Sequence, residues 1–401
     1  MCFRKFALLA ALACVAYGAP SVAAAQTLST STQEAPLVTL ELRDTLDIWR
    51  NLSGGVTRGY TSLDKLQFAA SLHGEALGRP GFVVHAELFK TNGESLSGSR
   101  TGDIQTVSNV EALSALRLFQ LWAEQRLRLG EAHSVTVRAG LTDLNASFDS
   151  IAPASLFLNS SHGIGPDISK SGRSGPSIFP VSSLGAQASW AEDDVWTVTT
   201  AIFDGVPGDP AHPKAFVSVN FGRDDGALLI AQTDRKLGND GQVSVGLWRY
   251  TGSVPSIRNP SQLVTGRPGL YAFVEGPFVG ASRGWLRAGV ADGRVQPVSA
   301  YLGGGLVWPG FLPGRSEDQV GIAVAHAVIS PQSRRQSGLP RAETTFEATY
   351  SYTVNPGLSL QPDIQYIVSP SLAPHLPDAL AIGLRIVARL ERPREPASGG
   401  D

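Results

Sequence analysis

Polar and aromatic side chains alternate with apolar ones in the segment 117–129, and the polar set is suited to binding a hydroxyl-rich solute. Trp122, Glu124, Arg126 and Arg128 recur at every second position. Alternate side chains of a strand point to the same face, so these four residues would form one row. The opposite, apolar face would carry Phe119, Leu121, Ala123, Leu127 and Leu129. Arg and carboxylate groups make charge-assisted hydrogen bonds, and the flat face of an indole could stack on a sugar ring.

The same alternation places other charged residues on this polar face. They are Glu87, Arg138, Arg287, Asp363, Arg385 and Arg389. A pore for anions would carry a basic ring, and a pore for cations an acidic ring. The mixed signs favour neutral, hydroxyl-bearing solutes, unless the charges pair with each other as salt bridges within the wall.

Ser161 and His162, beside Asn159, invite a hydrolase interpretation, because a Ser/His pair is the core of nucleophilic catalysis. Adjacent side chains seldom point at each other, however, and no Gly-x-Ser-x-Gly elbow surrounds Ser161. We favour a hydrogen-bond cluster that fixes a loop.

Asp143, Asn145 and Asp149 are spaced loosely like the ligands of a calcium loop. The closing bidentate Glu and the mid-loop Gly of such a loop are missing. The histidines also lack metal-binding spacing. The sequence therefore predicts neither a metal site nor a cofactor.

These side chains must be positioned by strands, and the two-residue period that is typical of strands recurs from end to end of the chain. It is clearest near the C-terminus, where Leu380, Ile382, Leu384, Ile386, Ala388 and Leu390 alternate with Ala381, Gly383, Arg385, Val387 and Arg389. Repeated aliphatic and polar faces are typical of a wall with lipid on one side and water on the other. A soluble all-β protein, whose strands also alternate, is the alternative.

Seventeen segments have this character, each near the length that a tilted strand needs to cross a bilayer. They lie near 37–48, 61–73, 81–90, 117–129, 134–141, 182–190, 195–203, 214–221, 227–233, 242–250, 269–276, 284–291, 298–307, 319–328, 343–353, 357–367 and 379–390. Bacterial single-chain barrels close with an even number of strands. We therefore predict one closed antiparallel transmembrane barrel of about sixteen strands over residues 37–390, with one segment false or two merged.

Two connections are unusually long. The interval 91–116 contains Ser108 and Glu111, which could begin a short helix. The interval 142–181 is rich in Gly, Pro, Ser and Asn, and so long a loop is usually functional or disordered. We predict that it folds inward and narrows the barrel, with Asp143, Asn145, Asp149, Asn159 and Ser160 as its polar constriction residues.

The tryptophans offer a second signal. Trp49, Trp190, Trp196 and Trp308 lie near predicted strand ends, where aromatic residues form interfacial girdles. Trp122 falls in mid-strand on the polar face. It is therefore the aromatic candidate for contact with a sugar.

The two ends of the chain differ in composition from the predicted barrel. Residues 1–25 resemble a secretory signal, with Arg4 and Lys5, an apolar core and a small-residue cleavage site before Gln26. Residues 26–36 form a polar lead, and residues 391–401 a polar tail. Both cysteines, Cys2 and Cys14, lie in the signal, so the rest of the chain cannot form a disulfide.

Composition excludes some classes of function. Without Arg4 and Lys5 the chain holds 31 basic and 35 acidic residues, which does not favour binding to nucleic acid. Beyond the signal, no stretch reaches the roughly 18 consecutive apolar residues that mark a membrane helix. A mean hydropathy of zero suits both soluble proteins and membrane barrels.

Several motifs resemble the carbohydrate-selective porins of the OprB type, in the same order along the chain. They are Asn51–Gly55 with Gly59-Tyr60, Val107–Glu111 with Arg117-Leu118 and Leu121–Gln125, Asp143–Asp149, Phe157–Gly163, Phe179-Pro180 with Gly185, Glu347–Tyr350, Leu360–Tyr366 with Pro370, and Gly383–Arg385. The resemblance covers essentially residues 37–390.

The resemblance implies a sixteen-stranded barrel in the outer membrane of a Gram-negative bacterium, through which small sugars diffuse passively. Outer-membrane lipid and the barrel-assembly machinery would be its partners, whereas the oligomeric state stays open. Family members typically end their last strand on an aromatic residue, but here Leu390 stands at that position, followed by the polar tail. A non-selective diffusion porin is the main alternative function, and a barrel hydrolase using Ser161 and His162 is a remote one.

Overall fold

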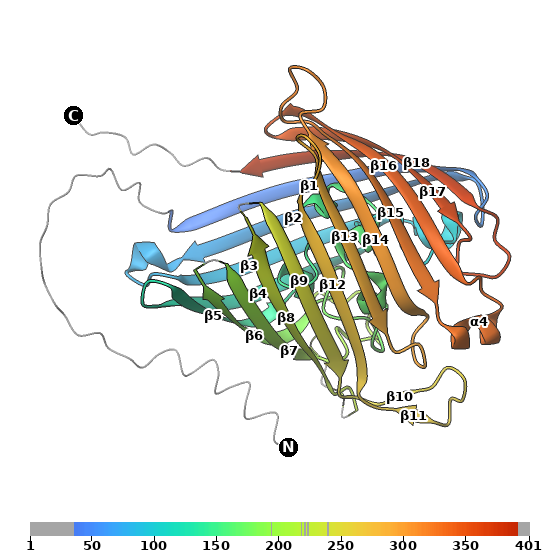
Figure 1. The fold of residues 1–401 in the computed structure, drawn as a ribbon, viewed down its shortest axis with the longest axis horizontal. Coiled ribbons are helices and arrows are strands. Elements are labelled where there is room, and N and C mark those ends of the chain that lie inside the picture. Colours follow the sequence, from blue (N-terminus) through green and yellow to red (C-terminus); the bar gives the residue numbers. More distant parts are fainter. Residues whose placement is uncertain are drawn as a thin grey trace, which may run out of the picture.

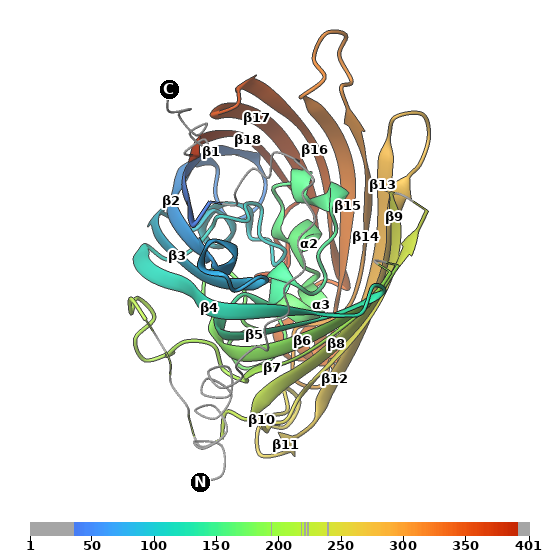
Figure 2. The ribbon, with the colours of Figure 1, turned by 90° about the vertical axis from the view of Figure 1, so that its left-hand side faces the viewer.

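Sixteen strands close into a single antiparallel barrel, as the alternating pattern predicts (Figures 1 and 2). The computed structural model describes residues 36–391, except 194, 218, 220, 221, 223 and 239. The predicted signal peptide, nearly all of the polar lead and nearly all of the polar tail lie outside these described residues.

Each strand pairs with its neighbour in sequence, and β1 pairs with β18 to close the ring. The first eight barrel strands are β1 (Val38–Ser53), β2 (Gly59–His73), β3 (Phe82–Gly93), β4 (Ala115–Leu129), β5 (His133–Thr142), β6 (Ser183–Glu192), β7 (Trp196–Asp204) and β8 (Ala227–Leu237). The other eight are β9 (Gly241–Tyr250), β12 (Arg267–Pro277), β13 (Arg283–Ala291), β14 (Val298–Pro309), β15 (Gln319–Ile329), β16 (Ala342–Asn355), β17 (Leu358–Val368) and β18 (Ala379–Glu391).

The predicted strand at 214–221 is wrong. No described residue of this segment is in a strand, and the segment belongs to the connection between β7 and β8. Its Phe216 carbonyl accepts a hydrogen bond of 2.8 Å from the Leu118 backbone of β4. The pairing of β4 with β5 begins only at Leu121, so this apolar segment takes up part of the exposed edge of β4.

A bulge in β4 overturns a second sequence-based assignment. The alternation places Phe119 on the lipid face, but the pairing with β3 shifts by one residue between Glu87 and Leu88. A one-residue shift reverses the face to which a side chain points. Phe119 therefore turns inward, is 4% exposed, and contacts the rings of Phe89 and Phe179.

Two long connections fold into the barrel (Figure 2). The first inward loop, 94–114, contains the single helical turn η2 (Ser97–Thr101) but no helix after Ser108, so that predicted helix is wrong. The second inward loop, 143–182, contains η3 (Leu144–Ala146), η4 (Pro153–Leu156), α2 (Ser160–Gly163) and α3 (Pro166–Ser169). The sequence predicted the inward path of the second loop but not of the first.

The remaining connections are mostly short turns at one end of the barrel and mostly longer loops at the other. The longer ones include a two-stranded ribbon, β10 (Val254–Pro255) with β11 (Leu263–Val264), and a helix, α4 (Pro331–Ser337) (Figure 1). In outer-membrane barrels the longer loops face the exterior of the cell. Among the described residues, no helix is both long and apolar enough to cross a membrane.

Candidate functional site: the barrel interior

The second inward loop is held by an apolar core inside the barrel. Its Phe148, Phe157 and Ile168 are almost fully buried against inward side chains of β7–β15, including Trp248 and Tyr271. Burying one such side chain contributes about 1.5–3 kcal/mol. The loop thus covers the aromatic part of the inner wall.

Arg287 of β13 joins the second inward loop to the wall. Its Nε and Nη2 atoms donate to the Asp149 carboxylate at 3.1 and 2.9 Å, and Nη2 donates to Asp167 Oδ2 at 3.0 Å. Arg287 is only 2% exposed. It lies on the inner face that the alternation predicted, but it anchors the loop and does not line the open pore.

Polar side chains of β16 and β17 hold the same loop through its backbone. The Glu347 carboxylate accepts hydrogen bonds from the amides of Leu158 and Asn159 at 2.5 and 3.1 Å. Asn159 Nδ2 donates to Gln365 Oε1 at 3.1 Å. Asp363 accepts from Gln365 at 3.1 Å and is 5% exposed, so the loop covers this candidate as well.

The first inward loop is held in the same way against β1, β16 and β18. Arg385 donates to both oxygens of Asp47 at 2.7 and 2.8 Å, and to Asn109 Oδ1 of the loop at 2.8 Å. Glu343 accepts hydrogen bonds from the backbone of Ile104 at 2.9 and 3.1 Å. Arg385, which is 7% exposed, therefore contacts the loop and is not part of the open pore.

The inner faces of β2–β6 are the part of the wall that the two loops leave most open, and we call them the open strip. Glu124 and Arg138 are partly exposed here and form an ion pair, with Nε–Oε2 and Nη2–Oε2 distances of 2.8 and 2.7 Å. Arg126 and Arg128 are exposed, and Arg126 Nη2 donates to Ser134 Oγ at 3.3 Å.

Trp122 lies in the open strip, but neighbours cover both faces of its ring. His85 of β3 stacks on it with a centroid distance of 4.9 Å, and the Arg138 guanidinium of β5 lies 4.1 Å from its centroid. These strands flank β4 on opposite sides. Trp122 Nε1 also donates to Gln120, which donates to the buried Glu87 at 2.8 Å. The indole thus organises the strip and leaves only its edge for a solute.

The predicted constriction residues divide into two groups. Asp149 and Asn159 are buried and fix the loop. Asp143, Asn145 and Ser160 are partly exposed. Asn145 Nδ2 donates to the carbonyls of Phe148 and Gly163 at 3.1 and 3.0 Å, which closes the first turn of the loop.

Asp143 begins the second inward loop, and its carboxylate accepts a hydrogen bond of 2.9 Å from the Asn145 amide. Burial raises the pKa of Asp143 to about 7, while the Asn145 amide opposes this shift. Its charge therefore changes near neutral pH, at the point where the loop leaves β5.

Ser161 and His162 do not form a catalytic pair in this arrangement. Ser161 Oγ donates to the Gln105 carbonyl at 3.4 Å, and neither ring nitrogen of the buried His162 has a hydrogen-bond partner among the described residues. Burial lowers the pKa of His162 to about 3. Such a group is neutral at physiological pH and packs against Phe157 and Trp285.

The comparisons with known proteins agree with this geometry. The sequence profile described as "Carbohydrate-selective porin, OprB family" matches residues 57–390. The chain belongs to this family. It is an outer-membrane porin through which carbohydrates diffuse.

Solved porins show the same fold at low sequence identity. The high-pH structure of Pseudomonas putida OprB has a TM-score of 0.75 and 19% identity, covering 88% of this chain and 94% of that chain. The outer membrane channel DcaP of Acinetobacter baumannii has a TM-score of 0.55 and 8% identity, covering 88% of this chain and 97% of that chain. No curated protein sequence matches this chain significantly.

The tryptophans of this porin follow the girdle prediction only in part. Trp190 and Trp196 point outward and are 37% and 38% exposed, whereas Trp308 is partly exposed. Trp49 is 1% exposed, and its Nε1 donates to Asp47 at 3.3 Å. Its assignment to an interfacial girdle is wrong, because Trp49 points into the barrel and the first inward loop covers the inner face of β1 there.

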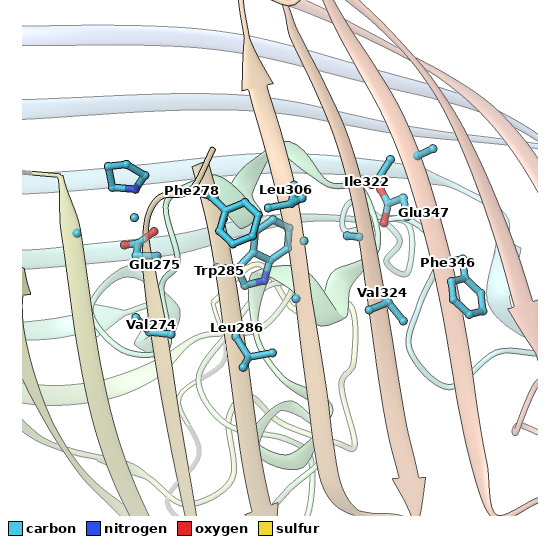
Figure 3. A pocket seen from close by; sticks show the side chains of 18 of the residues that line it. Val274, Glu275, Phe278, Trp285, Leu286, Leu306, Ile322, Val324, Phe346 and Glu347 are labelled. Atoms are coloured by element: carbon cyan, nitrogen blue, oxygen red, sulfur yellow. The ribbon is translucent and has the colours of Figure 1, made fainter. Parts of the chain in front are cut away.

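A large hollow of the porin lies on the outside of the wall, between β12 and β18 (Figure 3). It measures about 1170 Å³, and outward apolar side chains such as Leu286, Ile322 and Phe346 line it. This surface is part of the lipid-facing wall, so the hollow is not the route of the sugar. No group of three or more potential metal ligands occurs among the described residues.

Proposed function

We propose that small neutral sugars cross this porin along the open strip, between the inner faces of β2–β6 and the two inward loops. One observation carries the proposal: the loops bury the inner charges Arg287 and Arg385 of the wall opposite, whereas Arg126 and Arg128 stay exposed. The second inward loop forms the opposite side of the route and sets its narrowest section.

The chemistry of the open strip supports a hydroxyl-bearing solute. Glu124 and Arg138 neutralise each other, and Arg126 and Arg128 can donate to sugar hydroxyl groups. A hydrogen bond that replaces one to water contributes only about 0.5–1.5 kcal/mol. Each contact with a sugar is therefore weak, which suits a pore that must release what it admits.

Liposome swelling tests the proposed selectivity. Vesicles that contain the porin should swell faster with monosaccharides and disaccharides than with amino acids of matched size, and protein-free vesicles provide the control. Equal rates for sugars and amino acids would instead identify a non-selective diffusion porin. The remote alternative is a barrel hydrolase that uses Ser161 and His162. Support for it would require hydrolysis by the porin that a Ser161→Ala variant abolishes.

We also propose that export removes residues 1–25 and that the barrel-assembly machinery inserts the chain despite its non-aromatic last strand. The n-region, apolar core and A-x-A site support cleavage before Gln26. Mass spectrometry of the membrane-extracted protein checks this point. A mass that includes residues 1–25 would contradict cleavage.

A further inference from the structure

Arginines are concentrated in three neighbouring loops at the outer end of the barrel. The loops are 251–266, 292–297 and 330–341, and together they contain five arginines and one acidic residue, Asp292. The first inward loop, by contrast, holds Glu94, Asp103 and Glu111 with one arginine. The positive charge is therefore local and not a property of the whole rim.

Four of these arginines lack an acidic partner in the part of the chain that the structure describes, and we call them the arginine patch: Arg258, Arg334, Arg335 and Arg341. Arg294 is the fifth, and it pairs with Asp292 at 2.6 Å. No carboxylate of the described residues lies within ion-pair distance of the patch. The Nε atom of Arg334 is also buried without a hydrogen-bond acceptor. These donors could therefore bind an acceptor that the described part of the chain does not supply.

Hydrogen bonds hold the three loops together as one unit. The Ile257 amide donates to the Arg294 carbonyl at 2.9 Å, and the Ser330 amide donates to the Pro297 carbonyl at 2.7 Å. The Ser330 side chain also caps α4 by accepting from the Ser333 amide at 3.2 Å. The patch thus lies on a framework that is formed before any ligand arrives, which lowers the entropic cost of binding.

A hollow of about 470 Å³ lies between α4 and the loop that carries the β10–β11 ribbon, at the end of the barrel where Figure 1 shows both elements. Arg258 borders it on one side, and Gln332, Arg335 and Gln336 on the other. Residues spaced by three and four positions share one face of a helix. Guanidinium groups bind phosphate oxygens in a bidentate manner, and the two amides suit the hydroxyls of an attached sugar.

We propose that this hollow binds a phosphorylated saccharide of the outer-leaflet glycolipid. The inference rests on the outer-membrane location of the porin, because only there do phosphate-bearing sugars of a lipid lie at the level of the outer loops. The volume exceeds the need of a lone phosphate, and the combination of Arg258 and Arg335 with two glutamines fits a phosphate joined to a sugar ring. The bound glycolipid would fix the barrel at its outer rim.

The test uses the full-length porin in detergent, titrated with lipopolysaccharide or with the same lipopolysaccharide after removal of its phosphates. The parent protein should bind the phosphorylated form, and removing the phosphates should weaken binding roughly tenfold or more, as the loss of charge-assisted hydrogen bonds predicts. The Arg258→Gln/Arg335→Gln double variant should lose a similar factor for the phosphorylated form. Arg58→Gln, an exposed arginine outside the patch, is the matched control and should bind like the parent.

Three results would overturn the proposal. The first is equal binding of both lipopolysaccharide forms, and the second is an unchanged affinity in the double variant. The third is full competition by glucose 6-phosphate at a comparable concentration, because that result would identify a soluble anion as the ligand. Liposome swelling is measured on the same variants. If the double variant swells at the parental rate, the sugar route is intact, and a failure of the glycolipid proposal then says nothing against that route.

Discussion

Arg138 has two partners that fix its position in the open strip. Glu124 binds its guanidinium through two contacts to one carboxylate oxygen, and the Trp122 ring lies beneath it. Arg126 and Arg128, one strand away, have no carboxylate partner among the described residues. Paired side chains shape the wall, and unpaired side chains are free to exchange water for a sugar hydroxyl.

Replacing Arg126 and Arg128 together by Ala should weaken the sugar block of ion current by about fivefold, the effect of losing roughly one net hydrogen bond. Single-channel recording with and without sugar measures this block, and the open-channel conductance should rise. Leu127→Ala, which points to lipid between the two arginines, is the control. An unchanged sugar block in the double variant would assign selectivity to the loops.

Asp143 predicts a dependence of stability on pH. Its pKa is raised from 3.8 to about 7, so the folded protein binds this proton more tightly than the unfolded chain does. Stability therefore falls as pH rises from about 4 to about 7, and the cost is fully present above that range. Asp143→Asn should raise the melting temperature at pH 8 and leave it nearly unchanged at pH 4.

Circular dichroism in detergent measures these melting temperatures. Asp193 lies in the turn between β6 and β7, at the opposite end of the barrel. The Asp193→Asn variant therefore serves as the control for removal of one carboxylate. A stabilisation of equal size at both pH values would contradict the role of Asp143.

At the scale of whole elements, the second inward loop depends on Arg287 of β13 for its attachment to the wall. Replacing it by Ala leaves Asp149 and Asp167 buried without a cation, which typically costs about 3–5 kcal/mol. The loop should leave the wall, conductance should rise, and sugars should pass with less discrimination. Single-channel recording and liposome swelling measure these effects.

Two further variants make the Arg287 result interpretable. Arg283→Ala removes a partly exposed arginine from the same strand, one that donates to the Asp240 carbonyl, and should leave conductance unchanged. Arg287→Met combined with Asp149→Asn and Asp167→Asn removes the buried charges together and should restore part of the docking. Parental conductance in a correctly folded Arg287→Ala variant would show that the apolar core alone holds the loop.

Sequence periodicity predicted the elements better than it predicted their environment. Alternation identified the strands and the inner faces of Arg287 and Arg385, because side-chain direction is a local property of a strand. It failed at Phe119, where a bulge depends on the pairing with β3, and at 214–221, where an apolar segment lies along a strand edge. Burial of Trp49 depends on a loop distant in sequence, which no local pattern reports.

At the scale of the whole molecule, the closed wall and the two inward loops together define one route. The loops bury much of the inner faces of β7–β18, including Arg287, Glu347 and Arg385, whereas Arg126 and Arg128 of the open strip stay exposed. This arrangement explains why the barrel has many charged inner residues but few that are exposed. It also predicts which positions a reagent in the pore can modify.

Cysteine accessibility tests this central claim most directly, because Cys2 and Cys14 are the chain's two cysteines and both lie in the predicted signal. Thr136→Cys places a thiol on the open strip, and Thr345→Cys places one on the inner face of β16, where Thr345 is 0% exposed. With a charged thiol reagent, the Thr136→Cys variant should react quickly, lose current and be protected by sugar, whereas the Thr345→Cys variant should react slowly. Equal reaction rates, or no protection by sugar at position 136, would contradict the proposed route.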